Sequence, residues 1–420
     1  MRKRLVLIAL SVSLCRLISS ASPAFSKSVS DKLEEVKELI ATQPNQSLVI
    51  TNNLLELKEL SKADLGEIYY QRGRIYFKGL HDKHESIINH YKALRYFRQL
   101  NDVERQYATL TYLGFAYKDL FRYDYALDYY NEILELDMND VNSSLYTYYN
   151  IAKTLRLKGS YDSAITVHHG LIPSFKSRNM VEDLMKVYLE LGACNIELGN
   201  WHEAQSSYEK VYQLASGHSQ EQLYMAKAIS SLGYVYLQLE ELPLAQQYLN
   251  QSLPYLQQEI EGLDLAIGYN NLGMMALRLS NEQAARKYFL IVADLDPSVH
   301  NTQEVILALG KLVDLSKEIG ELNTALKYSE QLTDVMNPFV ELASKLEILH
   351  AQYKAETVHM QIQAFELQES LLKSKLKNTY IFIILALFCL VGGFLAYRIN
   401  RMRKVDAEVI QYLKRKLNVT

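Results

Sequence analysis

The sequence is poor in the residues and motifs that mark metal proteins and most enzymes. It has three Cys and one Trp among 420 residues. Cys15, Cys194 and Cys389 lie far apart, which excludes a disulfide framework and a cysteine metal site. Phosphate loops, nucleophile elbows and GxGxxG dinucleotide motifs are also missing. We therefore expect no enzyme activity and no cofactor.

The histidine pairs and the net charge argue against two further functions, metal binding and nucleic-acid binding. His81 and His84 lie close in sequence, as do His168 and His169, but neither pair has a Glu or Cys at ligand spacing. We therefore expect no metal site. The net charge of −3 argues against a dedicated nucleic-acid binder. Tyr, in contrast, is abundant at 31 residues, and can wedge between helices with its hydroxyl in water.

The N-terminus has the order of a secretory signal. Met-Arg-Lys-Arg is followed by the apolar run 5–14 and by small residues at 19–24. We predict a signal peptide over residues 1–24, cleaved after Ala21 or Ala24. A lipoprotein site at Cys15 and an uncleaved anchor are the alternatives.

A second apolar segment predicts a membrane span. Residues 379–397 carry no charge and would form a helix of about 28 Å, with Tyr380 and Tyr397 near its two ends. A buried helix of the folded domain is the alternative. The tail 398–420 is rich in Lys and Arg, which favours the cytoplasmic side. The expected location is the inner membrane, single-pass, with the N-terminal bulk in the periplasm and the tail in the cytoplasm.

Between these segments a short pattern repeats six times. A small residue is followed by Ala twelve positions later, and the first members are 38, 40, 41, 40 and 40 residues apart. Such a period predicts stacked helix hairpins, an all-α solenoid of a kind that binds partners. The pairs are Gly114 with Ala126, Ala152 with Ala164, Gly192 with Ala204, Gly233 with Ala245, Gly273 with Ala285, and Val313 with Ala325.

Several units add an aromatic residue four positions after the Ala. Tyr130, Tyr208 and Phe289 hold this place, and Pro297 closes the fifth unit. The small residues should let two helices approach closely, while the aromatic ring fills the space beside them.

This pattern resembles the tetratricopeptide repeat over roughly residues 31–336. The resemblance implies a right-handed superhelical solenoid with six units at 102–336, preceded by degenerate helix pairs at 25–101. Gly73 begins one further unit, but Glu85 stands where Ala is expected, so its second helix should be shifted or longer. The family leaves the ligand open.

The resemblance also implies a concave groove lined by the first helix of each unit. Basic and aromatic residues there would suit an acidic or extended peptide, and a solvated helix face is the alternative reading. The Lys/Asn/Arg clamp of chaperone-binding members is absent at matching positions. The candidate groove residues are Lys118, Tyr146, Tyr149, Lys153, Arg156, Lys186, Tyr234, Asn270 and Arg278.

Residues 337–378 predict a long helical stalk. The segment 341–378 has no Gly or Pro, and one helix of that length would span about 55 Å. A broken heptad seam suggests a coiled-coil homodimer, and a single amphipathic helix capping the last repeat is the alternative. The seam residues are Leu346, Leu349, Tyr353, Met360 and Leu367.

The order of these parts resembles the membrane-anchored tetratricopeptide sensors of Bacteroidetes-type bacteria. Such proteins commonly continue into an output domain, whereas only 23 residues follow Tyr397 here. The first hypothesis is binding of an exported protein or peptide, coupled across the membrane to a cytoplasmic signalling partner. A scaffold for envelope proteins, with the span as a tether only, is the alternative, and an enzyme with an unrecognised site is a remote third. Residues 405–417 are expected to form a basic helix on the inner leaflet.

Overall fold

In a computed structural model, the chain is described over residues 22–417, except 137, 139, 219, 258–262 and 298–301. All regular secondary structure in these residues is helical. The chain divides into two units, Met1–Leu346 and Glu347–Thr420. Residues 1–21 of the predicted signal peptide lie outside the described part.

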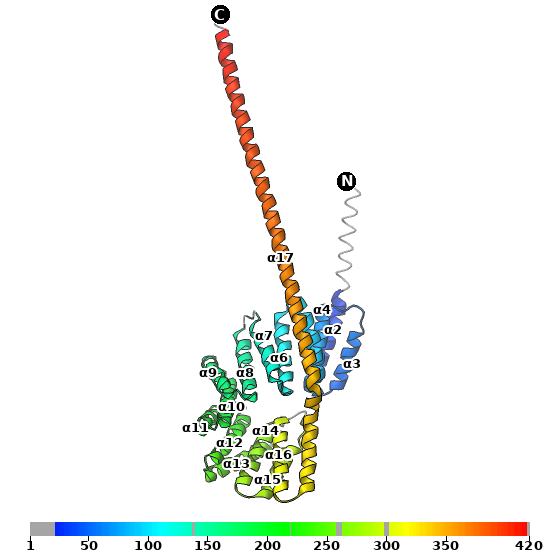
Figure 1. Ribbon diagram of the computed structural model, residues 1–420, viewed down its shortest axis with the longest axis vertical. Helices are drawn as coiled ribbons and strands as arrows, with labels where there is room; N and C mark the ends of the chain where they lie inside the picture. Colours follow the sequence, from blue (N-terminus) through cyan, green and yellow to red (C-terminus); the bar gives the residue numbers. More distant parts are fainter. Residues whose placement is uncertain are drawn as a thin grey trace. The chain divides into compact units, whose positions relative to one another are not determined.

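The first unit is a series of antiparallel helix pairs that follow one another in chain order along a curved path (Figure 1). Short turns join the two helices of a pair, so each helix packs on its neighbours in sequence.

The N-terminal helices are α2 (Ser22–Leu39), α3 (Pro44–Leu55), α4 (Lys62–Arg74), the π-helical turn η1 (Ile75–Gly79) and α5 (Lys83–Leu100). Five regular pairs follow: α6 (Val103–Asp119) with α7 (Tyr123–Leu134), α8 (Val141–Leu157) with α9 (Tyr161–Ser177), α10 (Val181–Glu197) with α11 (Trp201–Ala215), α12 (Glu221–Gln238) with α13 (Leu242–Gln257), and α14 (Leu263–Arg278) with α15 (Glu282–Ala293). The sixth pair is α16 (Thr302–Glu318) with the start of α17 (Leu322–Leu417).

The repeated small residue lies where the two helices of a pair cross. A methyl group added to Gly114 would lie 2.3 Å from Cε1 of Tyr130, the residue sixteen positions later. The same overlap would occur between Gly192 and Tyr208, and between Gly273 and Phe289. The predicted contact between the small and aromatic residues of one unit is therefore present, and it sets the helix spacing.

One residue of each hairpin turn adopts a left-handed backbone. It lies seven positions after the small residue of each unit. The amide of the next residue donates the 6→1 hydrogen bond of a Schellman cap, as in Ser160 N–H to Leu155 O at 2.8 Å. Only three of these six residues are glycines. The set is Phe121, Gly159, Gly199, Glu240, Ser280 and Gly320.

The unit that begins at Gly73 is shifted by one residue. The π-helical turn η1 adds a residue before the hairpin, so the left-handed residue is His81 rather than the residue seven positions on. The ring facing Gly73 is then that of His90, seventeen positions later, with Nδ1 2.5 Å from where a Cβ would lie. Ser86, fully buried, takes the place expected for Ala at Glu85.

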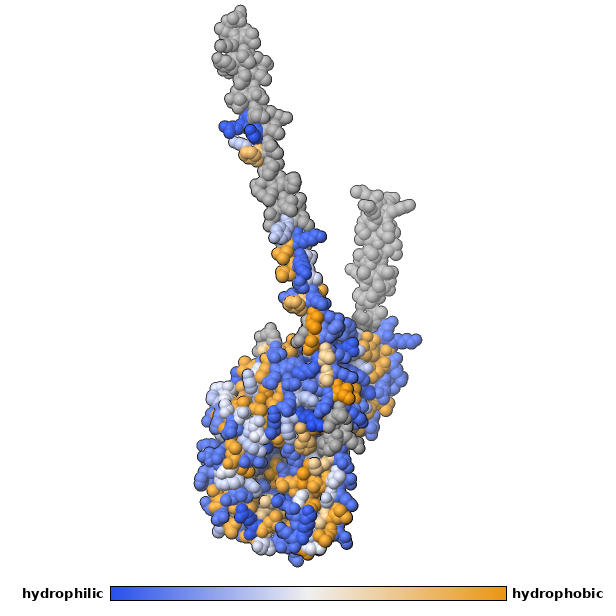
Figure 2. Space-filling view, viewed as in Figure 1, coloured by the Kyte–Doolittle hydropathy of each residue, from blue (hydrophilic) through white to orange (hydrophobic). Residues whose placement is uncertain are grey.

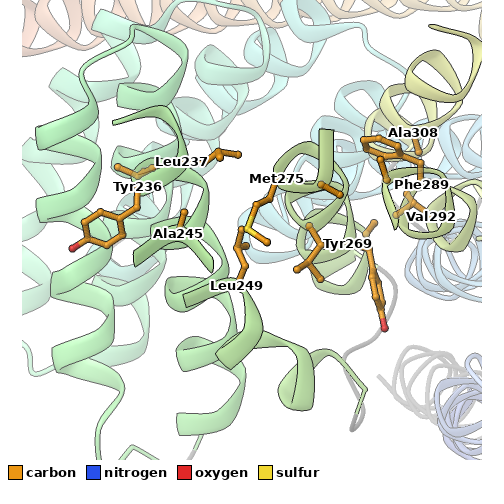
Figure 3. Packing of buried hydrophobic residues seen from close by; sticks show 14 of the residues in the cluster. Tyr236, Leu237, Ala245, Leu249, Tyr269, Met275, Phe289, Val292 and Ala308 are labelled. Carbon is orange, nitrogen blue, oxygen red and sulfur yellow. The ribbon is translucent and has the colours of Figure 1, made fainter. Parts of the chain in front are cut away.

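Buried side chains from successive pairs form one continuous apolar core in the C-terminal half of the array. Leu249 of α13 packs toward Met275 of α14, and Phe289 of α15 lies beside Ala308 of α16 (Figure 3). Each pair thus buries its inner faces against the next pair, as expected for a solenoid. In the N-terminal half, tyrosines join the core, and the hydroxyl of Tyr91 lies 2.6 Å from that of Tyr117.

The array curves far enough to bring distant units together. The side-chain amide of Gln303, at the start of α16, donates a hydrogen bond of 2.9 Å to the hydroxyl of Tyr123, at the start of α7. These residues are 180 positions apart in sequence. The contact links the turn of the first regular unit to the sixth, so the first helices surround a common interior.

Helix α17 does not begin at the predicted stalk boundary of residue 337. It starts at Leu322 as the second helix of the sixth unit and continues through Pro338. A proline within a helix removes one backbone hydrogen bond but does not require the helix to end. The stalk is therefore continuous with the last repeat.

The predicted membrane segment 379–397 lies within α17, but the side chains of 381–393 are outside the described part. Among the residues that were searched, no helix is both long and apolar enough to cross a membrane.

The predicted heptad seam is divided between buried and exposed positions. Leu346 and Tyr353 are buried, whereas Leu367 is exposed, and Met360 has no described side chain. Exposed apolar residues instead recur at Val358, Ile362, Phe365, Leu372 and Leu376, among hydrophilic side chains of the same stretch (Figure 2).

Candidate functional site

The interior of the first unit holds a cavity of about 890 Å³. Its walls come from the start of α5, the end of α6, the first helices α8, α10, α12, α14 and α16, and a short part of α17. A volume of this size lies at the upper end of the range of ligand-binding pockets.

In the three first helices α10, α12 and α14, the repeat places the same three positions on the cavity wall. They lie six and three residues before the small residue and one residue after it, a spacing that puts all three on one face of a helix. In α10 these are Lys186, Leu189 and Ala193; in α12 they are Lys227, Ser230 and Tyr234; in α14 they are Ile267, Asn270 and Met274. The wall composition therefore follows directly from the repeat register.

Seven of the nine predicted groove residues line this cavity: Lys118, Tyr149, Lys153, Arg156, Lys186, Tyr234 and Asn270. Tyr146 and Arg278 do not. Tyr146 is 38% exposed, and its hydroxyl donates to Asp183 at 3.2 Å. Arg278 lies near the exposed end of α14.

One wall carries more cations than anions. Lys83 and Lys118 share the carboxylate of Asp119, at 3.6 and 3.3 Å. Lys153 and Arg156 share that of Glu190, at 3.4 and 2.6 Å. Asp82, which also lines the cavity and acts on Lys83, balances the first group, so the excess positive charge lies with Lys153 and Arg156 and attracts an anion there.

Burial perturbs the charged groups of this wall. It lowers the pKa of Lys118 and of Lys83, and Asp119 opposes that effect in both. Burial also favours a raised pKa for Glu190, but the nearby Arg156, Lys153 and His168 outweigh it and hold that pKa well below its usual range. Glu190 is therefore a carboxylate that fixes the two cations in place.

The part of the wall formed by α14 and α16 offers acceptors. The side-chain amide of Asn270 donates to the Glu304 carboxylate at 2.7 Å and to the Glu304 carbonyl at 3.1 Å. Burial raises the pKa of Glu304. Glu197 and Asp334 also line the cavity. The lining thus carries both signs of charge, with an excess of cations at Lys153 and Arg156 of α8 and carboxylates at Glu304 of α16 and Asp334 of α17.

The structure also locates the histidine pairs. His81 and His84 both line the cavity, whereas His168 is fully buried beside Tyr149, with ring centroids 5.8 Å apart. Among the described residues, no group of three or more His, Cys, Asp or Glu is placed to hold a metal ion.

A family model of known proteins matches part of the repeat region. Residues 183–258, which include α11, α12 and α13, match the family model described as tetratricopeptide repeat. This stretch is similar to the tetratricopeptide repeat family. No curated protein sequence matches the chain.

Solved tetratricopeptide-like structures share the fold of most of the chain. The apo form of RapI is 14% identical with a TM-score of 0.52, covering 74% of this chain and 98% of that one. Aspartyl phosphate phosphatase F from Bacillus subtilis is 12% identical with a TM-score of 0.53, covering 74% and 94%. NprR in complex with its cognate peptide NprX is 16% identical with a TM-score of 0.51, covering 76% and 98%. At these identities the similarity concerns the fold alone.

Proposed function

We propose that the chain is a binding protein that takes up a peptide, or an extended segment of a protein, in the cavity of its helical array. The observation that carries this proposal is the cavity, whose lining carries both signs of charge at positions that the register of the repeat largely sets. A preformed cavity of this kind loses little conformational entropy on binding. An extended peptide supplies both charges and many backbone donors and acceptors, which suits a lining that carries both signs of charge.

Two structures of the same fold support this choice of ligand. One is a Rap protein complexed with competence and sporulation factor, at 14% identity and a TM-score of 0.51. The other is NprR with its cognate peptide. The NprR complex supports the choice of a peptide as ligand, and the ligand of the present chain is proposed from its own cavity.

We further propose that the array is exported and held at the inner membrane by residues 379–397, with the basic tail in the cytoplasm. The basic and apolar N-terminus and the uncharged segment support this arrangement. Because α17 continues from the sixth repeat unit toward this segment, binding would reach a cytoplasmic partner through one continuous helix. Reporter fusions at residue 340 and residue 415 test the topology: the first should be active only outside the cytoplasm and the second only inside.

The binding proposal is tested by filling the cavity. Ala193→Trp places a large ring on the wall of α10, and Ser206→Trp, on an exposed position of α11, is the matched control. We expect the full chain, purified in detergent, to retain a random heptapeptide pool as wild type and as Ser206→Trp, but not as Ala193→Trp. Equal retention by all three proteins would contradict binding in the cavity.

A further inference from the structure

One wall of the cavity contains a buried acceptor that nothing satisfies. Asn270 of α14 is 2% exposed and lines the cavity. Its amide nitrogen is used by Glu304, but its oxygen Oδ1 has no hydrogen-bond partner. A buried polar atom without a partner costs on the order of 1–3 kcal/mol, so such an atom in a binding cavity points to a missing donor.

The neighbouring carboxylate lacks a counter-ion. Among the described residues, Glu304 makes no salt bridge, and the Asn270 amide is the side chain that donates to it. Arg156 acts on Glu304 through space but is held by Glu190 at 2.6 Å, and Glu197 adds further negative charge. The pair Asn270 and Glu304 therefore presents an unused amide oxygen and an unneutralised carboxylate side by side.

We infer that this pair receives the free amino terminus of a linear peptide. An ammonium group carries three N–H donors and one positive charge, which complements an amide oxygen beside a carboxylate. The inference rests on the proposed function and defines one end of the same site.

The position of the pair favours a chain end over an internal residue. Glu304 follows Gln303, whose amide closes the array through Tyr123. We place the first residue of the peptide beside this closing contact, with the rest of the peptide extending into the cavity. Lys153 and Arg156, which together exceed the charge of Glu190 by one, line the same cavity, where they attract a carboxylate of the same peptide.

The test compares three defined heptapeptide pools on the full chain in detergent. The first pool lacks Lys and Arg and has a free amino terminus; the second is the same pool after amino-terminal acetylation; the third is acetylated and contains one Lys. We expect wild type to retain the first pool at least tenfold more tightly than the second, because a hydrogen-bonded charge is lost on acetylation. Retention of the third pool at the level of the first would assign the ammonium to a lysine side chain and overturn the chain-end assignment.

Variants on one helix provide the control. Glu304→Gln should abolish the preference for the free amino terminus, whereas Glu318→Gln, an exposed position at the far end of α16, should keep it. Equal retention of the first two pools by wild type would overturn the inference and leave the proposed function standing. Retention of no pool by wild type would overturn both. The comparison of pools on wild type needs no variant, so it holds even where a substitution impairs folding.

Discussion

Replacing glycine by alanine should have opposite effects at two helical positions of the array. Gly114 lies at a helix crossing, where an added methyl group would meet three ring atoms of Tyr130 at 2.3, 2.6 and 2.9 Å. Gly170, within α9, would place the same methyl group in open space. The substitution is chemically identical, so the contrast isolates the packing at the crossing.

The expected magnitudes follow from two opposing contributions. Alanine in a helix is more favourable than glycine by about 1 kcal/mol, at both positions. Overpacking of a filled core costs about 1–3 kcal/mol, and the short distances to a fully buried ring favour the upper end. We expect Gly170→Ala to stabilise its surroundings by up to about 1 kcal/mol and Gly114→Ala to destabilise its own by about 2 kcal/mol.

Hydrogen exchange is the suitable assay, because unfolding of a repeat array is not reliably two-state. Amides of α6 and α7 should exchange more than tenfold faster in Gly114→Ala, while those of α8 and α9 should slow in Gly170→Ala. Gly310→Ala in α16, also facing open space, is a second control. Equal effects of the three substitutions would refute the assignment of the small residue to the crossing.

Four further predictions follow from other parts of the chain. Burial lowers the pKa of His168 to about 4 from 6.5, so the unfolded state takes up a proton first as the pH falls. The free energy of unfolding should therefore decrease below pH 6.5, by about 2 kcal/mol at pH 5. His168→Phe should remove that part of the pH dependence in urea titrations. Glu190→Gln should cost up to about 3 kcal/mol in the same assay, because the partly buried Lys153 and Arg156 lose their counter-charge. Glu240→Gly should raise the melting temperature, since glycine relieves about 1 kcal/mol of left-handed strain. If the exposed stalk residues pair two copies, a lone cysteine at Phe365 should form a disulfide-linked dimer on gels under mild oxidation, and one at Ser206 should not.

The spacing of small, Ala and aromatic residues predicted the helix pairs because these residues meet within one hairpin. The contact is local, so a single unit contains everything needed to recognise it. The cavity-facing positions were largely predicted for the same reason, since they lie at fixed offsets from the small residue. Tyr146 stands at such an offset but turns to Asp183 instead, a choice of rotamer that periodicity does not reveal.

Other features depend on information outside a single repeat. The left-handed residue of each turn went unnoticed because Phe121, Glu240 and Ser280 occupy it as well as glycine. The closing contact between Gln303 and Tyr123 depends on the rotation accumulated over all units, which no one repeat encodes. The acidic partners Glu190 and Glu304 were missed because the periodicity of a helix predicts which residues face inward but not which of them form ion pairs or hydrogen bonds.

A displaced or longer second helix after Gly73 was predicted, but neither the size of the shift nor its cause was. Glu85 at the expected Ala position indicated a displaced or longer second helix. The structure shows that a π-helical turn adds the residue, and that Ser86 and His90 take up the packing roles. Such a turn has no distinct signature in the residues Ile75 to Gly79.

Site-specific photo-crosslinking in living cells tests the central claim most directly. A photoreactive amino acid at Ala193 reports on the cavity, and one at Ser206 reports on the outer surface. The account predicts an adduct at Ala193 whose mass spectrum identifies a peptide or an extended protein segment, and none of that species at Ser206. The same species crosslinked at Ser206, with Ala193 unreacted, would contradict binding within the cavity.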